Sequence, residues 1–83
     1  MNRQKLLHKI LGSSKNIRFT EMVNLVRGFG FELSRTDGSH HIFMKPDIPE
    51  LVNLQNIKGQ AKPYQIRQFL KLVEKHNLKL EDE

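Results

Sequence analysis

The sequence predicts a two-layer α+β domain in which two amphipathic helices cover one face of a three-stranded antiparallel sheet. Two stretches, residues 19–26 and 66–73, have apolar side chains at the i, i+3, i+4, i+7 spacing of a helix. Three short strand-like runs lie between them, separated by glycine or proline turns. Eighty-three residues suffice for one small domain with one modest core. The other face of the sheet is expected to stay open to water.

Two helices are predicted before the sheet. The first spans residues 2–11 and has an apolar stripe of Leu6, Leu7, Ile10 and Leu11. We expect this stripe to pack on the body of the domain. The second helix starts near Thr20 and Glu21, since a hydroxyl and an early acid suit the free N–H groups of a helix start, and it ends at Arg27 and Gly28.

The three strands are predicted at residues 31–34, 40–45 and 51–55. Asp37-Gly38 provides a tight turn between the first two, because glycine accepts a positive φ. Residues 46–49 contain two prolines and form the second turn. Residues 56–62 form a polar connection to the last helix, which runs from Pro63 to about His76. In the second strand Ile42 and Phe43 are both apolar, so the sheet face that holds the histidines is left open.

The composition limits the function classes. Fourteen Lys and Arg stand against nine Asp and Glu, and three of these acids are residues 81–83, so residues 1–80 carry fourteen basic and six acidic groups, or +8. Such a basic chain attracts nucleic acid, although the same charges can also serve only to keep the protein soluble. The absence of cysteine excludes disulfides and thiolate zinc sites. No apolar run approaches the roughly 20 residues of a membrane helix and no secretory signal is visible, which predicts a cytoplasmic protein without a membrane partner.

The pair His40-His41 follows the turn directly and is the candidate for chemistry. Adjacent strand residues point to opposite faces, so a shared metal is not expected. No cofactor motif is present. RNA carries its own nucleophile, the 2′-hydroxyl, so a histidine acting as acid or base is sufficient for cleavage. The candidate groups for phosphate are the hydroxyl of Ser39 and the cations Arg35, Lys45, Lys58 and Lys62. A non-catalytic RNA-binding module and a protein-interaction domain remain alternatives at this point.

Two blocks resemble the HicA family of toxins. The first is Asp37-Gly38-Ser39-His40-His41-Ile42-Phe43. The second is Leu54-Gln55 followed by Gly59-Gln60-Ala61-Lys62-Pro63-Tyr64-Gln65-Ile66-Arg67-Gln68-Phe69-Leu70. The resemblance covers residues 17–80 of a single domain spanning 1–83, and it leaves residues 1–16 as an N-terminal extension with a short extra helix.

The resemblance implies a fold like that of double-stranded-RNA-binding domains, with the order α-β-β-β-α. It also implies a metal-independent mRNA interferase, the toxin of a type II toxin–antitoxin pair, that needs no cofactor. The implied partners are an mRNA substrate and a HicB-like antitoxin that covers the active surface, with DNA contacted only through the antitoxin. The catalytic histidine of the family corresponds to His40, with His41 as second choice. Where many members have His-Pro after the aromatic residue, this chain has Lys45-Pro46, which removes a second proton-transfer group.

Overall fold

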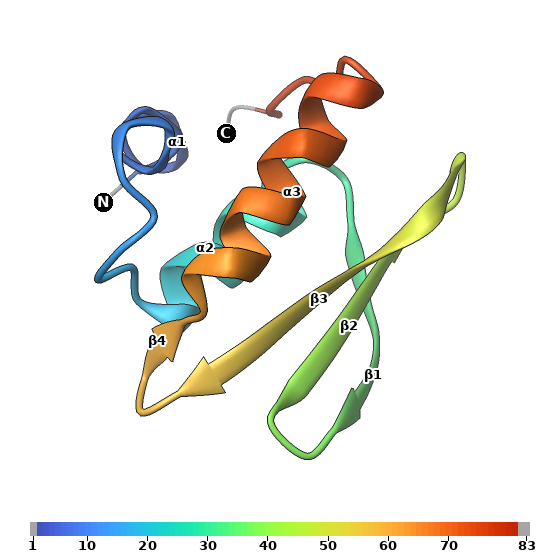
Figure 1. The fold of residues 1–83 in the computed structure, drawn as a ribbon. Coiled ribbons are helices and arrows are strands. Elements are labelled where there is room, and N and C mark those ends of the chain that lie inside the picture. Colours follow the sequence, from blue (N-terminus) through green and yellow to red (C-terminus); the bar gives the residue numbers. More distant parts are fainter. Residues whose placement is uncertain (1, 82–83) are drawn as a thin grey trace.

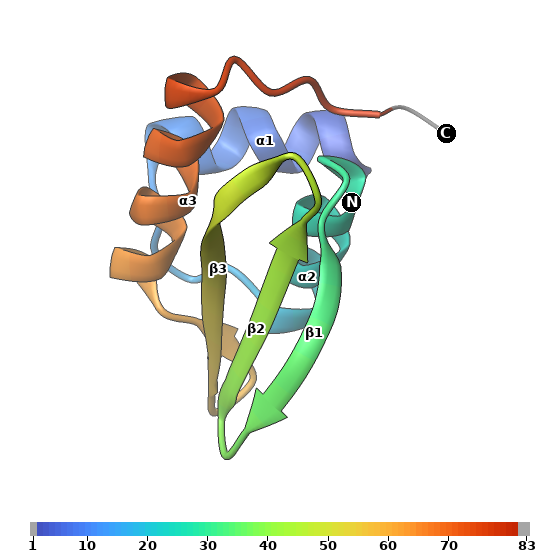
Figure 2. The same cartoon turned by 90° about the vertical axis from the view of Figure 1, so that its right-hand side faces the viewer.

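The computed structural model of the protein describes residues 2–81. The helices and strands follow one another in the order α1 (Arg3–Gly12), α2 (Phe19–Gly28), β1 (Glu32–Asp37), β2 (His40–Lys45), β3 (Ile48–Ile57), β4 (Gln60–Ala61) and α3 (Pro63–Lys75). The strands form one antiparallel sheet in the order β1-β2-β3-β4. Helices α2 and α3 lie on one side of the sheet (Figure 1), and α3 runs beside β3 (Figure 2). The predicted α+β fold is confirmed.

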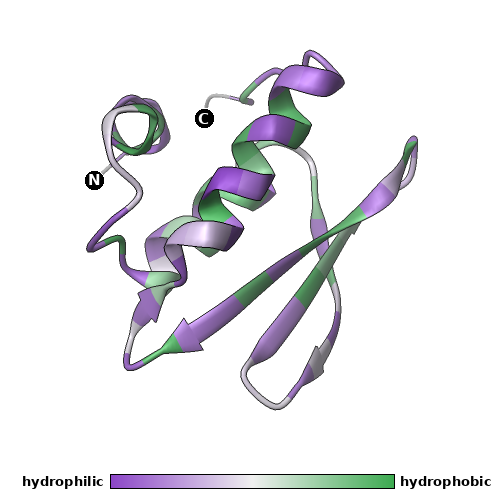
Figure 3. Cartoon of the chain, viewed as in Figure 1, coloured by the Kyte–Doolittle hydropathy of each residue, from purple (hydrophilic) through white to green (hydrophobic). Residues whose placement is uncertain are grey.

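The hydrophobic core lies between α2, α3 and the inner face of the sheet. Its largest side chains are fully buried phenylalanines, and the ring of Phe69 meets the rings of Phe29 and Phe31 edge-on at centroid distances of 5.4 and 5.9 Å. Along β3 and α3, hydrophobic and hydrophilic residues alternate (Figure 3), as expected for elements with one buried side. This burial fixes the orientation of every side chain on the central strands.

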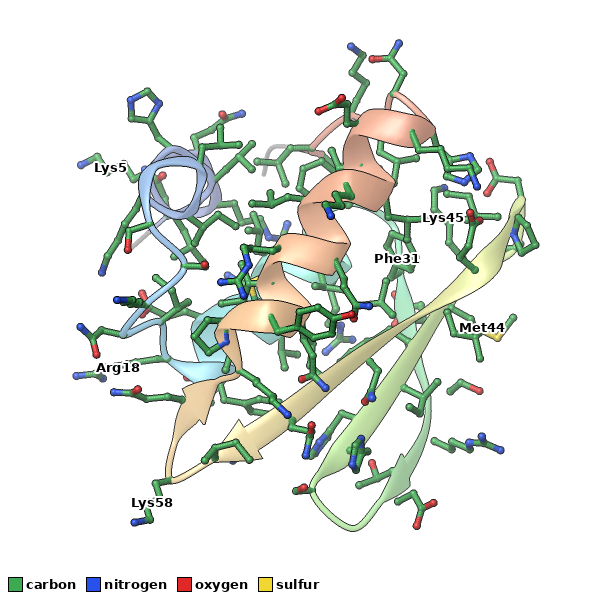
Figure 4. The ribbon with its side chains drawn as sticks, viewed as in Figure 1. Lys5, Arg18, Phe31, Met44, Lys45 and Lys58 are labelled. Carbon is green, nitrogen blue, oxygen red and sulfur yellow. The ribbon has the colours of Figure 1, made fainter. Side chains whose placement is uncertain are left out.

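The orientation of β2 is settled by Phe43, which is 1% exposed and faces the helices. Met44 points away from them, whereas Phe31 points toward them (Figure 4). Side chains alternate along a strand, so His41 lies on the inner face with Phe43, and His40 lies on the outer face with Ile42. The ambiguity left by two consecutive apolar residues is thereby resolved by packing.

The predicted N-terminal helix is present and packs on α2. Leu6 and Ile10 are buried in the core, whereas Leu11, which we expected to pack with them, is 65% exposed. Arg3 donates from Nε to the carbonyl oxygen of Asn24, at 3.1 Å, and from Nη2 to its side-chain oxygen, at 3.0 Å. The C-terminal segment also meets α2, where the N–H of Glu81 donates to the carbonyl of Gly28 at 2.8 Å. The N-terminal helix and the C-terminal segment, which lie outside the predicted two helices and three strands, therefore also pack against α2.

The sheet is larger than the sequence predicts. Strand β3 begins at Ile48 and extends to Ile57, and residues 60–61 form a fourth strand where we expected a polar connection. Lys58 and Gly59 join β3 to β4 with φ angles of 52° and 86°. Two successive positive φ values are the signature of a type I′ hairpin turn. The expectation of an irregular 56–62 segment was wrong because only the glycine of this turn is recognisable as a turn residue.

The first strand also differs from its prediction. It runs from Glu32 to Asp37, begins after Phe31, and has a register shift between Leu33 and Arg35. Phe31 is fully buried but Leu33 is 49% exposed, so these two residues do not both face the core as simple alternation suggests. An edge strand with an irregular register loses regular alternation of burial.

Candidate functional site

The turn between β1 and β2 places the two histidines. Gly38 has a φ of +61°, and Asp37 and His40 pair on either side of the two-residue turn Gly38-Ser39. The predicted tight turn is confirmed. His40 is consequently the first residue of β2, and its side chain stands at the tip of the hairpin on the outer face of the sheet.

His40 is held by an amide from the next strand. Its Nδ1 lies 3.1 Å from Oδ1 and 2.9 Å from Nδ2 of Asn53. The amide can therefore accept from a protonated Nδ1 through its oxygen, or donate to a bare Nδ1 through its nitrogen. Within residues 2–81, the other ring nitrogen, Nε2, has no hydrogen-bond partner. The ring is thus oriented by a neutral group and keeps one nitrogen for another molecule.

Two charged residues of β1 lie near His40 on the outer face. Asp37 is its direct cross-strand partner, and Arg35 pairs with Ile42 one position away on the same face. Both are exposed. The guanidinium of Arg35 thus lies on the histidine face and can bind a phosphate through its planar set of N–H donors.

His41 lies on the opposite face, against α2. Its ring centroid is 4.7 Å from that of Phe19, with the planes tilted by 58°. Its Nδ1 lies 3.1 Å from the carbonyl oxygen of Ser39. A carbonyl only accepts, so Nδ1 carries the proton and the lone pair of the neutral ring is on Nε2. His41 is therefore also oriented as a proton acceptor, with its ring against Phe19 of α2.

A glutamine pair connects the hairpin tip to α3. Gln65, which is 6% exposed, accepts from the backbone N–H of Gln55 at 2.7 Å and donates to its side-chain oxygen at 2.9 Å. The side-chain nitrogen Nε2 of Gln55 in turn donates to the hydroxyl oxygen of Ser39 at 3.5 Å. The N–H of Asn56 donates to the carbonyl of Ser39 at 3.2 Å. The tip is thus fastened to the body of the domain by directed polar contacts.

Sequence reasoning did not assign Asn53, Gln55 or Gln65 to the site. A signal was available for two of them, because alternation in the third strand sets Asn53 and Gln55 opposite the core residues Val52 and Leu54. Nothing in the sequence pattern indicates that Gln65, a buried polar residue on α3, reaches across to β3. Such a contact depends on the placement of the helix.

The predicted phosphate-binding cations do not gather in one place. Lys58 lies in the turn after β3 and Lys62 directly precedes α3, both at the end of the sheet where the β1–β2 turn lies. Lys45 ends β2, about 17 Å along the strand from His40. Figure 4 shows Lys45 and Lys58 at opposite ends of the sheet. The structure therefore does not bring Lys45 together with the histidines.

Lys45 has a different partner. Its Nζ lies 3.2 Å from a carboxylate oxygen of Asp47, and this hydrogen bond is the main reason why the pKa of Asp47 is lowered. The lysine side chain also covers Gly30, which has a φ of +95°. Through these contacts Lys45 connects the β2–β3 turn to the segment that follows α2.

Among residues 2–81, no three His, Cys, Asp or Glu side chains are grouped to hold a metal ion. His40 and His41 point to opposite faces, as expected from their adjacency. None of the helices in the same range is both long and apolar enough to cross a membrane.

A family model described as HicA toxin of bacterial toxin–antitoxin matches residues 19–74, which is more than half of the chain. The chain belongs to the HicA family. It is therefore the toxin of a toxin–antitoxin system and has an antitoxin as a partner. The match spans α2 through nearly all of α3 and includes both histidines, whereas α1 lies outside it. Searches of curated proteins and of solved structures found no significant match.

Proposed function

We propose that this HicA toxin is a metal-independent endoribonuclease, an mRNA interferase, with His40 as its proton-transfer group. The observation that carries the proposal is the ring of His40 at the hairpin tip. It is oriented through Nδ1 by Asn53, and its Nε2 has no partner within residues 2–81. The neighbouring Arg35 and the cations Lys58 and Lys62 suit a polyanionic substrate.

The reaction uses the hydroxyl that RNA itself provides. Nε2 of His40 removes the proton of the 2′-hydroxyl, the 2′-oxygen attacks the adjacent phosphorus, and the bond from phosphorus to the 5′-oxygen breaks. The leaving 5′-oxygen takes a proton from water or from a protonated side chain. The products are a 2′,3′-cyclic phosphate and a free 5′-hydroxyl. Arg35 and the hydroxyl of Ser39 stabilise the negative charge that builds up on the phosphate.

Asn53 serves this reaction as a positioning residue. When its oxygen accepts from Nδ1, the lone pair of the neutral ring is on Nε2, as a base requires. The imidazolium formed after proton transfer keeps the same hydrogen bond. That imidazolium can also give up its Nε2 proton as an acid, while Nδ1–H still donates to the amide oxygen. A neutral amide therefore supports both roles without fixing the charge of the ring.

His41 is the second choice for the same role. Its Nε2 also carries the lone pair, but the ring packs against Phe19 on the helix face, with the two planes tilted by 58°. The two assignments require RNA on different faces of the hairpin. Single alanine variants of the two histidines separate them, because the variants remove the base from only one face.

The decisive experiment incubates the purified toxin with RNA in the presence of a chelator. Shortened RNA with cyclic phosphate ends supports the proposal. The double variant His40→Ala with His41→Ala is the control and should leave the RNA intact. A non-catalytic RNA-binding module, which the basic composition also suits, would retard the RNA in a gel without shortening it. That outcome would replace the enzymatic proposal.

A further inference from the structure

Strand β3 has a free backbone edge along most of its length. Strand β4 pairs only with Asn56 and Ile57, so the preceding part of β3 has a neighbour on one side alone, β2. The other free edge, on β1, has charged residues, which discourage pairing with another chain. The stretch from Leu51 to Asn53 carries no charge. It is the edge better suited to receive a strand.

The direction of the backbone groups follows from two hydrogen bonds. The N–H of Asn56 donates toward the β2 side, to Ser39, whereas the N–H of Gln55 donates toward α3, to Gln65. Backbone groups of successive strand residues point to alternate sides. Leu51 and Asn53, in the same alternation as Gln55, therefore direct their N–H and C=O groups away from β2.

Pro49 supports this assignment. It lies inside β3 and shares the alternation of Leu51 and Asn53. Proline has no N–H, so a strand accepts it where that N–H would face a free edge. The position of Pro49 thus agrees with the assignment of the side of β3 away from β2 as a free edge, where no partner strand needs its N–H.

A groove runs beside this edge, between β3 and α3, with a volume of about 220 Å³. Figure 2 shows α3 alongside the edge of β3 that is turned away from β2. The groove is lined by residues 50–53 of β3 and by Gln65, Gln68, Phe69 and Leu72 of α3. Leu51 is 57% exposed in it. The groove thus combines an apolar floor with unpaired backbone groups.

Polar contacts bound the groove at both ends. The Gln55–Gln65 pair closes one end, and the contacts of the Glu50 carboxylate with Lys75 and His76 close the other. About three residues of edge remain open between them, or roughly 10 Å. This length accommodates a short extended segment and excludes a helix from pairing with the backbone.

The charge of the rim indicates the chemistry of the segment. Lys71 of α3 lines an adjoining hollow together with Gln68 and Leu72, which also line the groove. No ion pair holds Lys71 in the part of the chain that the structure describes. The one carboxylate of the groove, Glu50, is already paired with Lys75 and His76. The rim is therefore positive and complements an acidic side chain.

We infer that this edge of β3 is a docking site for the antitoxin, which adds a short extended segment bearing apolar and acidic side chains. Strand addition of this kind takes affinity from main-chain hydrogen bonds and specificity from the groove. The docking rests on the family's antitoxin partner. Its effect on catalysis rests on the proposed function, because Asn53 both lines the groove and orients His40. An added strand would pair on the side of β3 away from β2, so it would reach the proposed catalytic ring through Asn53.

Hydrogen exchange of the full-length toxin tests the inference, with the toxin measured alone and in complex with its antitoxin. The amides of Leu51 and Asn53 should exchange rapidly in the free toxin and become protected in the complex. Unchanged exchange on complex formation overturns the inference. Protection that is already present in the free toxin and is lost on dilution also overturns it, because the occupant is then a second copy of this chain.

A matched pair of variants measures the contribution of the backbone. Leu51→Pro removes an outward N–H as well as the side chain, whereas Leu51→Ala removes only the side chain. Affinity for the antitoxin should be about tenfold lower for the proline variant than for the alanine variant. Equal affinities contradict strand addition. RNA cleavage by the free variants should stay at the wild-type rate, which shows that the fold is retained.

Charge reversal gives a second test that does not alter the strand. Lys71→Glu should weaken antitoxin binding about tenfold, whereas Lys5→Glu, with the same charge change on α1, should not (Figure 4). Equal effects of the two variants argue against the site. These binding measurements need no RNA, so a toxin that fails to cleave RNA would refute the proposed function and leave this test valid.

Discussion

Near the start of β3 the carboxylate of Glu50 holds Lys75 and His76, and nearer its end the amide of Asn53 holds His40. Both histidines are partly buried and both have a cross-element partner. The hydrogen bond from Lys75, followed in size by that from His76, lowers the pKa of Glu50 to about 2. At this end of the strand, Glu50 therefore joins β3 to the end of α3. His40 meets a neutral partner and keeps Nε2 unbonded among the described residues.

The comparison teaches that the partner of a histidine, more than its burial, indicates its role. A carboxylate favours one charge state of the ring and fastens it in place. An amide orients the ring while leaving both protonation states accessible. The predictions below test whether Asn53, near one end of β3, serves RNA cleavage while Glu50, near the other end, serves only stability.

The largest effect is expected for His40→Ala. Removing a general base typically lowers a rate by about 10² to 10⁴, and RNA cleavage should fall by at least the lower figure. Because the side chain lies on the outer face, the circular dichroism spectrum and the antitoxin complex should be retained. His41→Ala is the matched control. If cleavage by His40→Ala stays normal while His41→Ala is inactive, the catalytic assignment moves to the helix face.

A smaller effect is expected for Asn53→Ala, which removes the group that orients His40. The loss of one hydrogen bond corresponds to about a tenfold lower rate. The conservative variant Asn53→Asp should retain orientation, but its carboxylate favours the imidazolium form of the ring. The rate–pH profile of Asn53→Asp should therefore move to higher pH. An unmoved profile would indicate a purely structural contact.

At the other end of β3, Glu50 should govern stability in acid and not cleavage. Its pKa is lowered from 4.5 to about 2, so its contribution is complete above pH 4.5 and is lost as the pH falls toward 2. Glu50→Gln should lower the urea midpoint at neutral pH and remove part of the fall between these two values. The cleavage rate of the folded variant should equal that of the wild type. Slower cleavage would mean that the two ends are not separate.

The smallest effect is expected for Lys45→Ala. This lysine pairs with Asp47 far from the hairpin tip, so RNA cleavage should change by no more than about twofold, the size of a surface ion-pair effect. Arg35→Ala, on the histidine face, should reduce cleavage by more, measured with the same RNA at the same salt concentration. A larger loss for Lys45 than for Arg35 would place the phosphate at the other end of the sheet.

Much of the fold was predictable because its signals are local. The helical spacing of apolar residues, Pro63 at the first position of α3 and the glycine of the β1–β2 turn all act within a few residues. The fourth strand was missed because Lys58 takes a positive φ, a conformation that is uncommon outside glycine. The irregular burial of β1 was missed because a register shift has no clear mark in its sequence.

The candidate site was predictable in part. His40, His41 and Ser39 are adjacent in the chain, so the turn that precedes β2 was enough to group them. The contact of His40 with Asn53 joins residues from two strands, and the contact of Gln55 with Gln65 joins a strand to a helix. Lys45 was placed in the site by its charge and its nearness in sequence, but the extended strand carries it away from the turn.

The sequence by itself determined the α+β fold, the histidine hairpin and the family, because periodicity, turn residues and motifs are properties of short segments. Only the tertiary structure decided which histidine faces the open side, which cations lie near it and which edge of β3 stays unpaired. The physical reason is that burial of Phe43 against the helices orients β2 as a whole, and no local preference of His40 or His41 specifies that choice.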